Sequence, residues 1–137
     1  MEINIEHLKF IQPIITRMNT NSFMIKGWSL TITSAFLAIY ASSNNIKFIL
    51  VAIFPVIFFL FLDAFYLQQE RKFRGIYNDV AKLTNDEERV DVRSFEMPTE
   101  KYQHGKYCYC DVICSKTILP FYLLITSILF VVYFCQQ

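Results

Sequence analysis

Residues 48–62 read FILVAIFPVIFFLFL, an apolar run that contains no charged side chain. With the flanking residues up to Leu67, the run reaches the roughly 20 residues that an α-helix needs to cross the hydrocarbon core of a bilayer. It therefore predicts a transmembrane helix over residues 48–67. Pro55 lies within this helix, where a proline produces a structural kink or, as the sharper alternative, a gating hinge.

The same helix is expected to continue into water beyond residue 67. No glycine or proline interrupts the chain before Gly75, and apolar residues with helical spacing follow at Phe73, Ile76, Tyr77, Val80 and Leu83. Basic residues that lie just beyond a span remain on the cytoplasmic side of the membrane. The sequence therefore predicts a cytoplasmic helical extension over residues 68–83, with topology anchors at Arg71, Lys72 and Arg74.

The composition is that of a membrane protein. Hydrophobic residues make up 54% of the 137 residues, with 14 Phe and only 3 Gly, which is too apolar for an ordinary soluble domain of this length. The net charge of +1 leaves no excess of basic residues for binding a phosphate backbone. Nucleic acid is therefore not expected as a partner.

Two further apolar runs predict transmembrane helices over residues 24–43 and 117–135. Only residues 44–47 separate the first of these from the helix over 48–67, so the two are expected to form an antiparallel hairpin. The helix over 24–43 is rich in Ser, Thr and Ala, which allow another membrane helix to approach closely.

The remaining segments are expected on the cytoplasmic side. Residues 1–23 predict an amphipathic helix, bent at Pro13, that either packs on the extension over 68–83 or lies flat on the membrane surface. Residues 84–116 predict a mixed segment with a short strand or an ordered loop. The predicted fold class is an all-α membrane protein.

The distribution of basic residues sets the expected orientation. With the N-terminus in the cytoplasm and the C-terminus outside, every Lys and Arg except Lys47 lies on the cytoplasmic side. The sequence therefore predicts a multi-pass membrane protein with its N-terminus in the cytoplasm and its C-terminus outside.

Asp63 is the acidic residue within the apolar part of a predicted span. A carboxylate at that depth costs several kcal/mol unless it is paired, solvated or protonated. In the antiparallel hairpin it would lie near Lys26, so an ion pair between Lys26 and Asp63 is the first interpretation. The alternative is that Asp63 lines a water-filled pore or senses protons.

A stripe of residues on the helix over 24–43 is the candidate for contact between copies of the chain. Ser29, Thr33, Phe36 and Tyr40 follow one another at steps of three and four residues, along one side of a helix. We expect this stripe either to meet neighbouring copies or to line a pore.

Cys108, Cys110 and Cys114, with His104 upstream, supply ligand types that zinc prefers. The Cys-x-Cys spacing differs from that of the usual zinc knuckles, and no second pair is present. Reduced cysteines that pack beside the membrane are the first interpretation, so neither a metal nor a cofactor is expected. The common catalytic motifs are also missing from the sequence, which makes an enzyme the least favoured class.

Two stretches carry a resemblance to other proteins. The first, over residues 10–28, reads FIQPIITRMNTNSFMIKGW, and the second, over residues 62–75, reads LDAFYLQQERKFRG. They resemble a group of small uncharacterised bacterial inner-membrane proteins with FIQ…RMxxNSFxxKGW and YLQQERKFR stretches. The layout is also similar to that of SLATT-type membrane effectors. That resemblance implies an oligomeric protein that opens pores in bacterial conflict when a cytoplasmic sensor is triggered, although the third span departs from the minimal SLATT pattern.

Three functional hypotheses follow. The first is an oligomeric effector that permeabilises or depolarises the inner membrane, with anti-phage defence as its setting. The second is a membrane anchor or scaffold that recruits a cytoplasmic protein, or responds to a signalling ligand, through residues 84–116. A small transporter or an enzyme subunit is the third. Each requires the lipid bilayer as a partner, and the first also requires a homo-oligomer.

Overall fold

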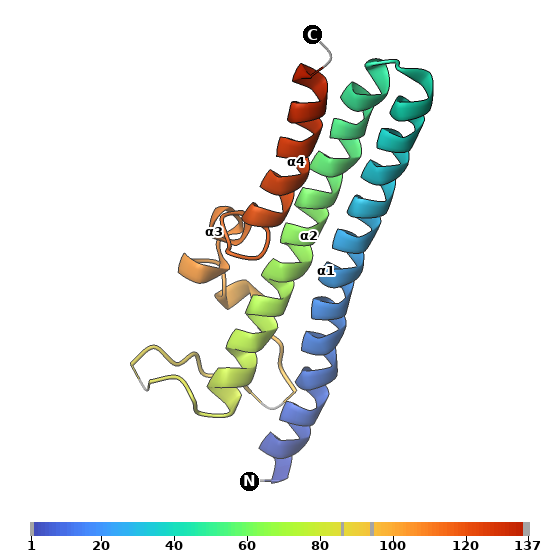
Figure 1. The fold of residues 1–137 in the computed structure, drawn as a ribbon. Helices are drawn as coiled ribbons and strands as arrows, with labels where there is room; N and C mark the ends of the chain where they lie inside the picture. The colour runs from blue at the N-terminus through green and yellow to red at the C-terminus, as the bar shows by residue number, and fades with distance from the viewer. Residues whose placement is uncertain (1, 86, 94, 136–137) are drawn as a thin grey trace.

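The computed structural model describes residues 2–85, 87–93 and 95–135, with side chains from Ile5 onward. The fold is all-α, as the sequence predicted. Two long helices, α1 (Glu2–Ser43) and α2 (Lys47–Val80), form an antiparallel hairpin, and α4 (Leu119–Phe134) runs beside α2 on one half of its length (Figure 1). The chain between α2 and α4 contains the short helix α3 (Tyr109–Ile113) and two 3₁₀ turns, η1 (Thr99–Lys101) and η2 (Gly105–Tyr107).

Helix α1 is a single element of 42 residues, about 63 Å long at 1.5 Å per residue. The sequence predicted a separate amphipathic helix over 1–23, but α1 continues through Pro13 and through the polar residues 19–22. Pro13 removes the backbone donor that would bond to the carbonyl of Lys9. Both residues are exposed, so solvent can satisfy that carbonyl and the helix need not end there.

Helix α2 has 34 residues and also continues through its internal proline, Pro55. The turn before it is closed by Asn44, whose φ of 50° is left-handed and whose amide donates to the Tyr40 carbonyl oxygen at 2.8 Å. After Val80, Lys82 adopts a φ of 57° and the Leu83 amide donates to the Asn78 carbonyl oxygen at 2.8 Å. This left-handed cap ends the helix three residues before the predicted end at Leu83.

Among the described residues, two helical stretches, Ile5–Ser43 and Lys47–Val80, are long and apolar enough to cross a bilayer. The 16 residues of α4 are apolar but span only about 24 Å, less than a hydrocarbon core of roughly 30 Å. The predicted helix over 117–135 is thus shorter than expected. Its start is delayed because residues 114–118 form turns, within which the Ser115 hydroxyl accepts a hydrogen bond from the Ile118 amide at 3.4 Å.

Two apolar clusters hold the helices together. One lies where α1, α2, α3 and α4 meet, and its buried members are Tyr40, Ile49, Ala52, Val56, Ala64, Val112, Ile118, Tyr122, Ile125 and Leu129. The other lies between the N-terminal half of α1 and the end of α2, where Ile11 and Ile76 are fully buried. The predicted packing of residues 1–23 on 68–83 is therefore present. Ile5, near the start of α1, and Leu83, the last apolar residue of the predicted extension, remain exposed.

The described part of residues 81–118 folds back along α2. No strand occurs in its described part, although the alternation over 90–95 had left a short strand open. Phe95 instead turns the chain with a φ of 62°, and its ring lies 5.7 Å from the ring of the buried His7. The segment therefore also closes over the start of α1.

Candidate functional site

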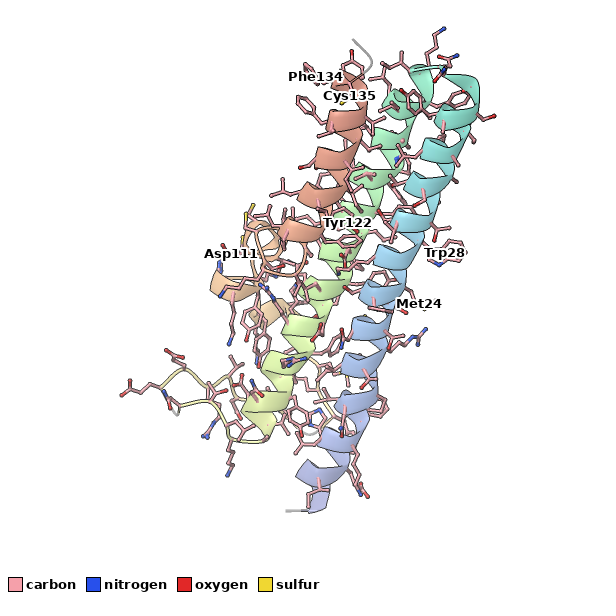
Figure 2. All side chains as sticks on the ribbon, viewed as in Figure 1. Met24, Trp28, Asp111, Tyr122, Phe134 and Cys135 are labelled. Atoms are coloured by element: carbon pink, nitrogen blue, oxygen red, sulfur yellow. The ribbon has the colours of Figure 1, made fainter. Side chains whose placement is uncertain are left out.

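A group of polar side chains from three helices lies buried in the middle of the apolar hairpin. Ser22, Lys26 and Ser29 follow one another at steps of four and three residues, so they occupy one face of α1. Asp63 faces them from α2, and Tyr122 points from α4 into the same space between the helices (Figure 2). We call these five residues the polar cluster.

The centre of the polar cluster is a closed triangle of charged and polar contacts. The Lys26 ammonium Nζ lies 2.6 Å from Asp63 Oδ2 and donates to the Ser22 hydroxyl at 3.0 Å. The Ser22 hydroxyl in turn donates to Asp63 Oδ1. Asp63 is completely buried, so this triangle supplies the counter-charge and donors that a carboxylate needs away from water. The ion pair that the sequence predicted between Lys26 and Asp63 is confirmed.

The other side of the polar cluster is formed by the hydroxyl groups of Ser29 and Tyr122. Both residues are buried. The Tyr122 hydroxyl is the neighbour of both the Asp63 carboxylate and Ser29, so α4 also contributes a polar group beside the buried carboxylate.

The polar cluster is accessible from one side. A cavity of about 520 Å³ reaches Ser22 and Lys26 from the direction of the basic end of α2, where Arg71 and Arg74 line it. In the opposite direction the space between the helices is filled by buried apolar residues, among them Val56, Ala52 and Ile49. Within one chain, the cavity therefore ends at Ser22 and Lys26, the two residues that contact the buried Asp63 carboxylate.

The stripe Ser29, Thr33, Phe36 and Tyr40 faces the interior of the hairpin within one chain. Ser29, Thr33 and Tyr40 are buried, and the partly exposed Phe36 packs against the cluster of α2 and α4 side chains. The Thr33 hydroxyl is used internally, since it donates to the Ser29 carbonyl oxygen at 2.8 Å. The stripe thus packs mainly within one chain, and its role between copies or along a pore stays a prediction.

Two members of the polar cluster were not identified from the sequence. Ser22 lies within the amphipathic helix that was predicted over residues 1–23, and Tyr122 lies within the transmembrane helix that was predicted over residues 117–135, but neither was singled out. The i, i+4 spacing of Ser22 and Lys26 was a usable signal, because it places both side chains on the face that meets Asp63. No comparable signal marks Tyr122, whose position depends on how the loop before α4 folds.

The cysteine and histidine residues considered as zinc ligands do not come together. In the described part of the chain, no three His, Cys, Asp or Glu side chains are placed to hold a metal ion. Cys110, Cys114 and His104 are exposed, and Cys108 is partly exposed with a free thiol.

The predicted topology anchors have different surroundings. Arg71 donates to the Lys106 carbonyl oxygen at 3.0 Å, and Arg74 pairs with Glu70 at 2.5 Å on the same helix face. Lys72 lines none of the cavities beside them. Arg71 and Arg74 thus belong to a surface shared with the loop before α3.

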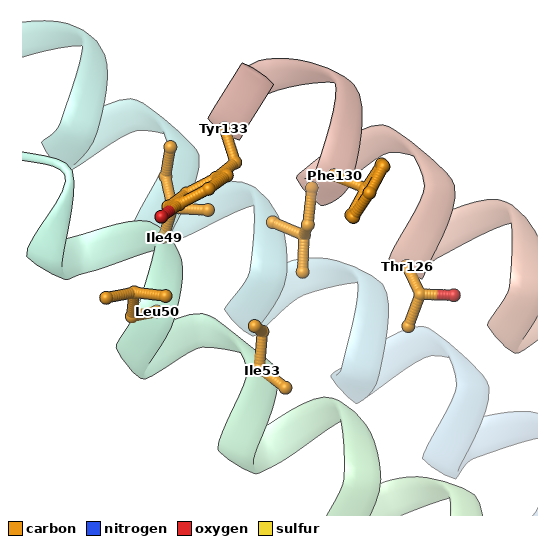
Figure 3. Close-up of a pocket in the computed structure, with 7 residues that line it drawn as sticks. Ile49, Leu50, Ile53, Thr126, Phe130 and Tyr133 are labelled. Atoms are coloured by element: carbon orange, nitrogen blue, oxygen red, sulfur yellow. The ribbon is translucent and has the colours of Figure 1, made fainter. Parts of the chain in front are cut away.

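A separate apolar groove of about 310 Å³ lies between α2 and α4 near the end of α4 (Figure 3). Its walls include Ile49, Ile53 and Phe130, and the Thr126 hydroxyl beside them donates to the Tyr122 carbonyl oxygen at 2.7 Å. The groove is therefore mainly apolar, with the Tyr133 hydroxyl as a further polar group in its lining.

Comparison of the chain with protein-family models, with curated proteins and with solved structures finds no match.

Proposed function

We propose that this chain is a multi-pass protein of the bacterial inner membrane that depolarises the membrane as a homo-oligomer, and that the Lys26–Asp63 pair holds it closed. The buried ion pair, which a cavity reaches from one side only, is the observation that carries this proposal. A charged pair at membrane depth is expensive and is typically retained for function.

Placement in the membrane is supported by the outer surface of the helices. Trp28 and Met24 project outward from α1 (Figure 2), and Phe54 on α2 and Phe130 on α4 are 77% and 63% exposed. Exposing such apolar surface to water costs free energy, and soluble proteins therefore rarely expose large contiguous apolar patches. The lipid bilayer covers them at no such cost.

The packing of a single chain supports the proposed assembly from several copies. The space between α1, α2 and α4 is filled by the apolar cluster, so one chain has no channel across it. A conducting path needs either a rearrangement within the hairpin or a lumen between copies. Breaking the Lys26–Asp63 pair would free both charges for such a path.

Controlled expression in bacteria, read with a voltage-sensitive dye, tests this function. The wild type is expected to lower the membrane potential when expressed strongly, and Asp63→Asn is expected to do so at a lower expression level because the pair is broken. Lys9→Gln, an exposed lysine on the same helix, is the matched control. Membrane-fraction blotting shows whether each variant inserts. Inserted, oligomeric protein that leaves the potential unchanged in every variant would exclude the effector function.

A membrane anchor for a cytoplasmic partner is the second candidate, because residues 81–118 are held against α2 by specific contacts. The Tyr102 hydroxyl bonds to Asp79, and the Gln68 side chain bonds to the Tyr107 carbonyl oxygen at 2.9 Å. An ordered surface of this kind suits partner binding. This function requires no change in membrane potential, so the same dye experiment separates the two candidates.

A further inference from the structure

A basic cavity lies beside the point where α2 leaves its apolar run. It has a volume of about 340 Å³ and is lined by Arg71, Arg74, Gly75, Asn78, Lys106 and Tyr107. Of these six residues, three are cationic, two carry neutral hydrogen-bonding side chains, one is a glycine and none is acidic. Such a lining favours an anion with several oxygen atoms.

One wall of the cavity is formed by residues 106–107 of the loop, which are hydrogen-bonded to α2. We call these two residues the strap. Gln68 Nε2 donates to the Tyr107 carbonyl oxygen at 2.9 Å, and Arg71 donates to the Lys106 carbonyl oxygen at 3.0 Å. Gly75 permits this close approach, because a Cβ atom there would lie 2.5 Å from the Tyr107 hydroxyl oxygen. The strap thereby carries Lys106 to the same cavity as the two arginines.

Much of the positive charge in the cavity is left unneutralised. Glu70, beside the cavity, already pairs with Arg74. A neighbouring cavity that shares Lys106 is lined by Asp79 and Glu88, and Asp79 already accepts hydrogen bonds from the Tyr102 hydroxyl and the Val90 amide. Arg71 donates one guanidinium hydrogen bond to a carbonyl group, which does not neutralise its charge. The Lys106 ammonium lies 5.2 Å from the centre of the uncharged Tyr107 ring. Arg71 and Lys106 therefore remain available to an anionic ligand.

The height of the cavity on α2 indicates which anion it meets. At 1.5 Å per residue, Arg71 lies about 6 Å and Arg74 about 10 Å beyond Leu67 along the helix. The headgroup layer of a bilayer is roughly 5–8 Å thick on each side. The adjoining cavity of about 520 Å³ shares Arg71 and Arg74 and adds the apolar Phe23 and Leu67. Arg71 therefore lies within the headgroup layer and Arg74 just beyond it, and charge at this level beside apolar surface matches the two ends of a phospholipid.

We propose that Arg71, Arg74 and Lys106 bind the phosphate group of an anionic phospholipid from the cytoplasmic leaflet. This inference rests on the membrane placement proposed above. Basic pockets beside membrane helices on the cytoplasmic side bind anionic headgroups in this way. A soluble phosphate compound offers the same chemistry, so the experiment has an arm for each source.

The test uses the full chain in nanodiscs of phosphatidylcholine, without and with phosphatidylglycerol. Native mass spectrometry of protein released from the discs measures which lipid is retained. The wild type is expected to retain phosphatidylglycerol preferentially, and Arg71→Gln and Lys106→Gln are each expected to weaken that preference about fivefold. Lys72→Gln, one residue from Arg71 but outside the cavity, is the matched control and should retain it fully.

Three outcomes would overturn the proposal. The first is that the wild type shows no preference for phosphatidylglycerol, and the second is that Lys72→Gln weakens this preference as much as Arg71→Gln does. The third is that millimolar pyrophosphate displaces the lipid and stabilises the protein equally in discs of pure phosphatidylcholine. The last outcome assigns the cavity to a soluble phosphate compound. Carbonate washing of cell membranes separates these results from a failure of the membrane placement. Protein that washes off was never embedded, whereas embedded protein without lipid preference removes only the present inference.

Discussion

The hydroxyl oxygen of Tyr102 lies 2.5 Å from Oδ2 of Asp79 and fastens the segment after α2 to the last turn of that helix. Both residues are buried, with 4% and 7% of their surface exposed. The Val90 amide donates to the same carboxylate oxygen at 3.4 Å. One carboxylate therefore anchors two points of the loop outside the apolar run.

This contact predicts that the loop loosens at alkaline pH. Burial, then the hydrogen bond and charge of Asp79, raise the pKa of Tyr102 above its usual value of 10.0. Because the folded pKa exceeds the unfolded one, the stabilisation is complete below about pH 10 and is lost as the pH rises further. Limited proteolysis across an alkaline series should show cleavage of the loop increasing above that pH. Tyr102→Phe should lose about 1–3 kcal/mol of the stability of the loop, so its cleavage should already be faster at neutral pH. Its cleavage rate should not rise further above about pH 10, because the titrating hydroxyl is missing. An unchanged alkaline step in Tyr102→Phe would assign it to another group.

Gly75→Ala is expected to displace the loop from α2. The added Cβ would lie 2.5 Å from the Tyr107 hydroxyl oxygen and 2.9 Å from the Tyr102 ring, and forced overpacking costs about 1–3 kcal/mol. Gly27→Ala on α1 is the matched control, since a Cβ there meets nothing within 4 Å and should stabilise the helix by up to about 1 kcal/mol. Thermal unfolding in detergent, followed by circular dichroism, compares the two. Equal unfolding temperatures would show that the loop does not lie against Gly75.

Lys26→Met is expected to destabilise the protein more than Asp63→Asn. The first change leaves a completely buried carboxylate without its cation, which costs about 3–5 kcal/mol. The second leaves a lysine whose side chain is 19% exposed and opens into the 520 Å³ cavity, so we expect a loss of only about 1–3 kcal/mol. The double variant should recover much of the loss in Lys26→Met. Lys9→Met, on an exposed site of α1, serves as the control, and an equal loss there would contradict the energetic role of the pair.

Native cysteines report the proposed orientation. Cys110 and Cys135 are both exposed and free; Cys135 lies at one end of the hairpin, whereas Cys110 belongs to α3, which lies about half-way along it (Figures 1 and 2). In variants that keep only one of them, a membrane-impermeant maleimide should label Cys135 on intact spheroplasts and Cys110 only after permeabilisation. The reverse pattern would invert the proposed topology, and labelling of both on intact cells would place Cys110 outside the cytoplasm.

The hairpin and its ion pair were predictable because they depend on short-range patterns. The uncharged run over 48–62 and the brief turn at 44–47 leave one arrangement for α1 and α2, and that arrangement brings Lys26 to the level of Asp63. Patterns of this kind require only helix geometry and a count of residues.

The length of α1 and the place of Tyr122 were not predictable in the same way. Pro13 usually marks a helix boundary, but tertiary packing of Ile11 on Ile76 keeps the helix continuous around it. Tyr122 enters the polar cluster only because the segment over 81–118 folds back on α2, which depends on contacts such as Gln68 to Tyr107 between residues far apart in the chain. The same long-range packing buries Thr33 inside one chain, where helical periodicity alone could not tell an inner face from an outer one.

The continuity of α1 couples its two ends mechanically. No break separates the end that carries His7 from the end that carries Tyr40, and the Lys26–Asp63 pair holds α1 to α2 at a point between them. The two arms are about 28 Å and 21 Å long at 1.5 Å per residue. When α1 turns as a rigid rod about the Lys26–Asp63 pair, a displacement of the His7 end by a few ångströms moves the Tyr40 end the opposite way by about three quarters of that distance. A ligand or partner that binds at the loop could produce that displacement.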